Sequence, residues 1–81
     1  MADWLEDARE RLESGVEGAG DLVLSSRDAE LLLQLARIAA HESGERTNAP
    51  LVCFLVGLAV GRGTATVESA TELALGRDTD R

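Results

Sequence analysis

The chain contains 81 residues, of which 44% are hydrophobic and 28% charged, and its formal net charge is −7. This length allows one small domain with a single core, which we place over residues 1–81, and the composition is that of a folded domain rather than a disordered one. All eight basic residues are arginines, and so acidic a chain repels phosphate backbones, which argues against a nucleic-acid partner.

The first predicted element is a helix over residues 3–14. Asp3 is placed to cap this helix, with Glu6 three positions later completing a capping-box pattern. Trp4 lies at the entry, and it has two interpretations: an anchor that packs the helix onto the body, which we favour, or an interface residue that a partner covers. At helical spacing one face gathers Leu5, Ala8, Arg9 and Leu12.

Three glycines interrupt the helical pattern, so residues 15–21 are expected to form a loop. The segment follows a helix rather than a strand and lacks the Lys-Ser/Thr ending of a phosphate-binding loop, so it matches neither that motif nor the dinucleotide fingerprint. Leu22, Val23 and Leu24 come next, and we expect them to pin the loop to the core as a hydrophobic staple.

A second and longer helix is predicted over residues 26–43. Ser25 or Ser26 is placed to cap its start, and Gly44 is suited to its end because glycine readily adopts the left-handed conformation. The apolar residues of this helix cover a broad arc, which implies contact with more than one neighbouring helix.

Ten residues without a charge or strongly polar group, 51–60, form the most apolar stretch of the chain. Such a run is compatible with a buried strand or a buried helix. Pro50 with a cap at Thr47 or Asn48 favours a helix over 49–61, because proline is tolerated in a first helical turn and no partner strand is evident. This helix is expected to form the centre of the core.

Small residues recur every four positions along this central helix, at Cys53, Gly57 and Gly61. This spacing predicts a notch where a neighbouring helix packs closely. Gly57 and Gly61, together with Phe54 and Trp4, are therefore our candidate interface residues.

A last helix is predicted over 65–75, with a cap at Thr64 or Thr66 and an end at Gly76; the tail 77–81 is expected to fray. The complete pattern predicts an all-α protein, a small four-helix bundle around the central apolar helix.

The densest polar cluster lies at the elbow between the second and third helices. His41 is a candidate general base, Glu45 a residue that orients it, and Arg46 and Asn48 candidate ligand contacts. The alternative, which we favour, is that these residues are helix caps and solvated charges. A lone histidine beside a carboxylate falls short of a zinc site, and Cys53 is expected to be a buried small hydrophobe, so we predict no metal, no cofactor and no enzyme activity.

Several segments carry a resemblance to a known family: Asp-Trp-Leu at 3–5, Leu-Leu-Gln-Leu-Ala-Arg-Ile-Ala-Ala-His at 32–41, Glu-Arg at 45–46, Ala-Pro-Leu at 49–51 and Phe-Leu-Val-Gly-Leu-Ala-Val-Gly-Arg-Gly at 54–63. They resemble a small actinobacterial helical domain family of unknown function. Its members also occur C-terminal to proteins similar to molybdenum-cofactor guanylyltransferases. The resemblance implies a helical accessory domain. The transferase's nucleotide loop and metal-binding carboxylates have no counterpart in this chain, so it implies no transferase activity.

We therefore expect a non-catalytic helical interaction or accessory module, as a homodimer or bound to a protein partner. The alternative is a small-ligand-binding domain that uses the elbow around His41–Asn48. No secretory signal is visible, and the apolar run is about half the length that crosses a bilayer, so a cytoplasmic protein without a membrane contact is expected.

Overall fold

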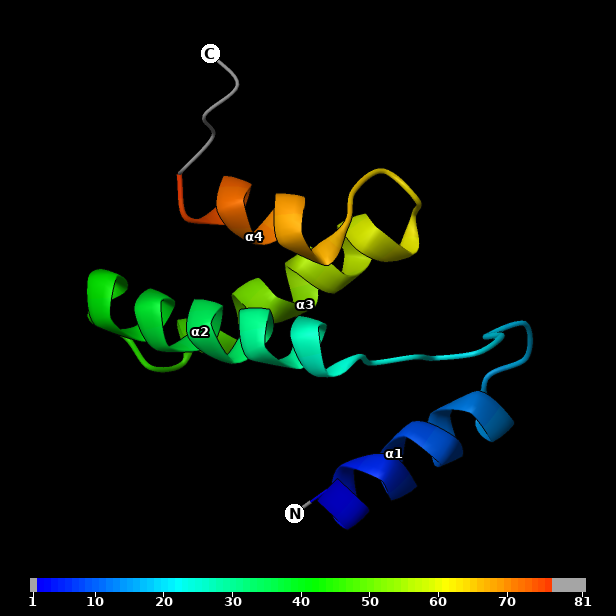
Figure 1. The fold of residues 1–81 in the computed structure, drawn as a ribbon. Helices are drawn as coiled ribbons and strands as arrows, with labels where there is room; N and C mark the ends of the chain where they lie inside the picture. The colour runs from blue at the N-terminus through cyan, green and yellow to red at the C-terminus, as the bar shows by residue number, and fades with distance from the viewer. Residues whose placement is uncertain (1, 77–81) are drawn as a thin grey trace.

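Four α-helices make up the structure, a computed structural model that describes residues 2–76 (Figure 1). Their bounds are α1 Ala2–Gly15, α2 Ser26–Ser43, α3 Asn48–Gly61 and α4 Val67–Ala74. No strand occurs among these residues, and the predicted helices agree with the observed ones to within two residues at either end. The all-α prediction is confirmed. The predicted frayed tail, 77–81, lies outside the described residues.

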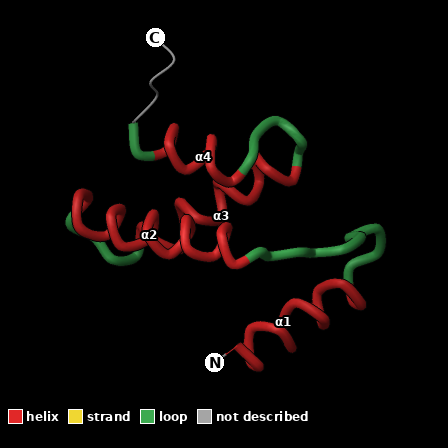
Figure 2. Tube along the Cα trace, viewed as in Figure 1, coloured by secondary structure: helices red, strands yellow, loops and turns green. Residues whose placement is uncertain are grey.

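The helices α2, α3 and α4 pack against one another, whereas α1 packs against none of them. Figures 1 and 2 show α1 standing apart, joined to α2 by a loop that runs on as an extended segment. The radius of gyration is 13.6 Å, compared with about 12 Å expected for a compact domain of this length. The structure is therefore a three-helix unit with a helical arm.

The core of the three-helix unit contains one buried apolar side chain from each helix. These are Leu35 of α2, Val56 of α3 and Ala70 of α4, which are 1%, 4% and 7% exposed. Partly buried side chains surround this centre: Leu32, Val52, Cys53, Val60, Ala65 and Leu75. So small a core indicates modest stability, since each fully buried aliphatic side chain contributes roughly 1.5–3 kcal/mol.

The ends of α2 are fixed by the residues that its sequence pattern indicated. The Ser25 hydroxyl accepts a hydrogen bond from the N–H of Asp28 at 3.0 Å, which satisfies one of the free donors of the first turn. At the other end Gly44 is left-handed, with φ of 76°, and its N–H donates to the carbonyl of Ala40. The chain then turns into α3.

The starts of α3 and α4 are built differently. Thr47 precedes α3 but its side chain caps nothing, and Pro50 lies in the first turn as expected. At α4 the hydroxyl of Thr66 accepts from the N–H of Ser69 while the Ser69 hydroxyl accepts from the N–H of Thr66, both at 3.1 Å. This reciprocal capping box supports a helix of only eight residues.

The arm is held to its own linker by a cluster of charges on one flank of α1. Arg9 donates to the carboxylates of Glu6 and Glu13, and Glu13 accepts the backbone N–H of Leu22 at 2.6 Å. The Arg9 guanidinium also donates to the carbonyl of Leu22 at 3.5 Å. The linker therefore folds back along α1 before it runs to α2.

Two predictions for this region are wrong. Asp3 lies inside α1 rather than ahead of it, and Glu6 pairs with Arg9 instead of completing a capping box. The expected staple at 22–24 is not formed either, because Val23 is 80% exposed and Leu24 is also exposed. The backbone of Leu22 is tied to the polar flank of α1, which leaves the neighbouring side chains uncovered.

Candidate functional site

One side of α3 is apolar and uncovered. Its three best exposed residues, Leu51, Phe54 and Leu55, are 61%, 65% and 61% exposed. The exposed residues of this helix span roughly 160° of its circumference at 100° per residue. We call them the open face: Pro50, Leu51, Phe54, Leu55, Gly57, Leu58 and Gly61. No member of the open face carries a charge or a polar side-chain group, so a large apolar surface meets solvent.

The opposite side of α3 supplies the core. Val56 is buried against α2 and α4, and Val52 and Val60 pack around it. Because α3 is apolar on all sides, each of its faces was equally suited to this contact. The expectation that this helix forms the centre of the core holds for one side of α3 only, because two neighbouring helices cover only one half of its circumference.

No other part of the described chain packs against the two glycines of the open face. A Cβ atom built on Gly57 or Gly61 would meet nothing within 4 Å outside the helix itself. The predicted packing notch is therefore used only at Cys53, whose thiol contacts the Leu32 carbonyl of α2, and no described residue packs on Gly57 or Gly61. A helix from outside this three-helix unit has room to approach α3 closely at this point.

A second uncovered apolar surface runs along α1. Trp4 is 70% exposed, so its interpretation as an anchor on the body is wrong in this structure. Val16 continues the helical hydrogen bonding, since its N–H donates to the carbonyl of Leu12 at 3.0 Å. We call the apolar row of this helix the α1 stripe: Trp4, Leu5, Ala8, Leu12 and Val16.

An open groove lies beside the open face, where α2, α3 and α4 meet. Its volume is about 460 Å³, and Leu51 and Leu55 of the open face line one wall. The other walls are largely apolar, with polar groups from Glu42, Ser43 and Asn48 at the elbow end. This volume is in the range of small-molecule sites, although the groove is open to solvent.

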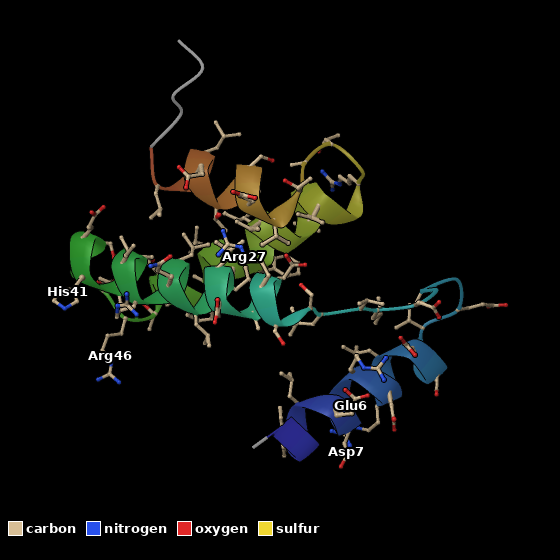
Figure 3. All side chains as sticks on the ribbon, in the orientation of Figure 1. Glu6, Asp7, Arg27, His41 and Arg46 are labelled. Atoms are coloured by element: carbon tan, nitrogen blue, oxygen red, sulfur yellow. The ribbon has the colours of Figure 1, made fainter. Side chains whose placement is uncertain are left out.

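The candidate residues of the elbow do not converge. His41, Glu45 and Arg46 are exposed and do not line the groove, whereas Asn48 is half-buried and does. Figure 3 shows the side chains of His41 and Arg46 at the same end of the molecule, both directed outward. Glu45 accepts a hydrogen bond from Thr47 at 3.4 Å, a contact within the elbow itself. The ligand role of these residues remains a prediction.

Cys53 lies at the edge of the core rather than at its centre. Its thiol is half-buried and donates to the carbonyl of Leu32 at 3.7 Å. Partial burial raises the pKa of the Cys53 thiol, because desolvation penalises the thiolate. A protonated, hydrogen-bonded thiol packs as a small hydrophobe.

Residues 2–76 contain neither a metal-binding cluster nor a membrane-spanning helix. No three histidine, cysteine or acidic side chains there come together in a way that would hold a metal ion. No helix in that range has both the length and the apolar character needed to span a bilayer.

The sequence identified Phe54, Gly57 and Gly61 of the open face, but it missed three exposed leucines, Leu51, Leu55 and Leu58. They were assigned to the core because their neighbours are apolar too. A usable signal was the shortage of covering surface: α4 is short, and α1 carries its own charged flank. The sequence does indicate that a short chain covers so apolar a helix with difficulty, but it does not indicate which side of α3 stays open.

Comparison with known proteins gives one family. The model described as "Domain of unknown function (DUF6457)" matches residues 1–81, so the chain belongs to this family. No curated protein matches the chain. No solved structure matches it either.

Proposed function

We propose that this member of the DUF6457 family is a non-catalytic interaction module, whose open face on α3 binds another protein chain. The observation that carries the proposal is the exposure of Leu51, Phe54 and Leu55, uninterrupted by any polar side chain. Monomeric proteins rarely leave a contiguous apolar surface of this kind in water, and such surfaces mark protein interaction sites.

The residue types of the open face support a protein contact over a small ligand. Phe54 is a large aromatic side chain near the middle of the face, the kind of residue that dominates binding energy at interfaces. Gly57 and Gly61 leave a flat, accessible backbone beside it. Aromatic residues and an absence of charge characterise the centres of interfaces.

Two classes of protein partner fit the proposal. The first is a second copy of the chain, which would form a homodimer. The second is a molybdenum-cofactor guanylyltransferase-like protein, as the resemblance at 32–63 implies, with this module in an accessory role in an actinobacterial cytoplasm. Cys53 is a free thiol, which suits the reducing conditions of a cytoplasm.

The direct experiment replaces one residue of the open face and one matched control. Phe54→Glu places a charge in the open face, while Leu33→Glu places the same charge at a 70% exposed leucine of α2. Self-association is measured by light scattering, and binding to a purified guanylyltransferase-like protein by calorimetry. We expect Phe54→Glu to abolish binding and Leu33→Glu to preserve it. Equal behaviour of the two variants would refute a role for the open face.

A second candidate function is the binding of a small ligand, favoured by the groove that Asn48 and the leucines of α3 line. An apolar molecule with a polar end would place its polar end near Asn48 and its body against Leu51 and Leu55. Arg46 and His41 are close in sequence to the residues that line this end of the groove, although neither lines it.

This candidate is tested with an apolar anionic dye, anilinonaphthalene sulfonate, by fluorescence titration. Binding in the groove predicts weaker binding for Asn48→Ala. A contribution of the elbow predicts a further loss on replacement of Arg46 and His41. If all three replacements leave the dye affinity unchanged, the elbow has no part in binding.

A further inference from the structure

Two apolar surfaces of this chain, the open face of α3 and the α1 stripe, have no partner among residues 2–76. We propose that they cover each other between two copies: the α1 stripe of one protomer packs antiparallel on the open face of its partner, and the partner returns the same contact. This arrangement rests on the proposed function and specifies the occupant of the open face.

The accessible surface of the chain shows how much contact is missing. It measures 6347 Å², whereas a folded monomer of 8.6 kDa is expected to expose about 4,700 Å². The excess is about 1,600 Å². A stable protein interface buries about 800 Å² on each partner, and the excess, part of which lies on the exposed linker, is large enough to include such an area.

The two surfaces match in length. From Trp4 to Val16 the α1 stripe spans about 18 Å at 1.5 Å per residue. From Pro50 to Gly61 the open face spans about 17 Å by the same rise. Two apolar helical faces of equal length can therefore pack along their whole extent. The exchange covers the α1 stripe and the open face of both protomers at once.

Side-chain size favours the antiparallel orientation. Trp4 is the largest side chain of the α1 stripe and lies at the N-terminal end of α1. Gly57 and Gly61 leave free space at the C-terminal half of α3. An antiparallel approach places the tryptophan ring over these glycines, a large side chain against a small-residue surface.

Charge supports the contact between these two elements. Seven of the fifteen acidic residues occur in the first 21 positions, on the arm and its linker. Arg46 and Arg62 flank the two ends of α3, and neither forms an ion pair within the described part of the chain. In the antiparallel contact Glu6 and Asp7 approach Arg62 of the other protomer, and Glu17 approaches Arg46.

The linker is short between its tie to α1 and the start of α2. Glu13 holds the backbone of Leu22 at 2.6 Å, so only four residue steps remain before Ser26. Four extended steps reach at most about 14 Å. A helix on the open face would lie about 18 Å from the axis of α2, two interaxial distances of about 9 Å each. Because Leu22 and Ser26 both lie off the helix axes, this reach also permits docking within one chain, and the oligomeric state decides between the two arrangements.

The test uses the full chain and two charge substitutions, one on each surface. Leu12→Glu alters the α1 stripe and Phe54→Glu alters the open face; both side chains are exposed in the single chain, 54% and 65% respectively. Leu33→Glu is the control outside both surfaces. Far-UV circular dichroism checks the helical content of each variant. If either loses helix, Leu12→Gln and Phe54→Gln repeat the test.

We expect the wild-type chain and Leu33→Glu to be dimers by light scattering, and Leu12→Glu and Phe54→Glu to be monomers. Trp4 is the only tryptophan, so its fluorescence reports the contact directly. The emission should shift to the blue as the wild-type concentration rises and stay unshifted in both monomeric variants.

Mixing the two monomeric variants separates exchange from other dimers. The Phe54→Glu chain keeps an intact α1 stripe and the Leu12→Glu chain keeps an intact open face, so the mixture should form a heterodimer with one of the two contacts restored. A symmetric contact between two α3 helices predicts no such recovery.

Each contrary outcome has a distinct meaning. If Phe54→Glu dissociates the dimer but Leu12→Glu does not, the exchange is wrong while the open face keeps its role in binding. If the dimer survives both substitutions, the exchange fails and the open face has no part in self-association; the calorimetric binding of the guanylyltransferase-like protein then decides the proposed function. A wild-type chain that remains monomeric at high concentration overturns the second copy as occupant; a blue-shifted Trp4 in that monomer would indicate docking within one chain.

Discussion

The carboxylate of Glu13 accepts the backbone N–H of Leu22 at 2.6 Å, a contact between residues nine positions apart. It ties the linker to α1, and it is reinforced by Arg9, which donates to both the Glu13 carboxylate and the Leu22 carbonyl. Because α1 packs against no other helix, this small network is what orders the linker next to the arm.

Removal of the Glu13 carboxylate should loosen the linker without unfolding the three-helix unit. In Glu13→Ala the N–H of Leu22 loses its acceptor, so amide hydrogen exchange at Leu22 should become faster while the amide of Leu35 keeps its protection. Glu10→Ala is the matched control, because Glu10 is an exposed carboxylate 3.9 Å from Arg9 that makes no contact with the linker. Equal exchange rates at Leu22 in the wild type and in Glu13→Ala would show that the contact does not protect this amide in solution.

Two neighbouring residues of α3 should differ sharply in their effect on stability. Val56→Ala removes two methyl groups from the buried centre and should lower the free energy of unfolding by about 2 kcal/mol. Leu55→Ala, at a residue that is 61% exposed, should change it by less than about 0.5 kcal/mol.

Urea denaturation at a protein concentration low enough to keep the chain monomeric measures both values. Equal losses for Val56→Ala and Leu55→Ala would mean that Leu55 is covered in the monomer and that the open face is narrower than described.

Alkylation of Cys53 should depend on pH differently in the folded and unfolded chains. Burial raises the pKa of this thiol, so the thiolate that reacts with iodoacetamide appears at higher pH in the folded protein than in urea. The same shift makes a stability contribution that is complete below the ordinary thiol pKa and is lost as the pH rises through the pKa of the folded thiol. Identical pH profiles in both states would show that the thiol is not desolvated.

The ion pair between Glu6 and Arg9 should be visible in an NMR titration. The hydrogen bond from Arg9 lowers the pKa of Glu6, so its side-chain carboxyl signal should titrate below the ordinary glutamate range, and Arg9→Ala should return it to that range. Because the folded pKa is lowered, the pair supports α1 above the ordinary glutamate pKa, and this support is lost as the pH falls through the folded value. An unchanged midpoint in Arg9→Ala would exclude Arg9 as the cause.

The helices themselves could be predicted because their ends are local features. Ser25, Gly44 and Thr66 act through hydrogen bonds or backbone conformations that involve residues three or four positions away. The sequence also favoured a helix over a strand for α3, because Pro50 suits a first helical turn, and Pro50 does lie in the first turn of α3. All the residues that take part in such a helix end lie within a few positions of one another in the sequence.

The burial pattern could not be predicted in the same way. In α2 the polar residues mark the outer side, and the buried Leu35 lies away from them. In α3 no polar residue marks an outer side, and nothing in the sequence distinguishes buried Val56 from exposed Phe54. The position of Trp4 depended on whether α1 packs on the body, a long-range contact that the local pattern of an amphipathic helix does not determine.

The core takes one buried apolar side chain from each of three helices, and this has a consequence for synthesis on the ribosome. Leu35, Val56 and Ala70 follow one another at short intervals along the chain, which favours rapid folding once all three are present. Until Ala70 has been synthesised, however, α2 and α3 can pack only against each other, so the surfaces that α4 covers stay exposed, and the arm made before them packs against neither helix. The nascent chain is therefore most exposed to aggregation in the interval between completing α3 and completing α4.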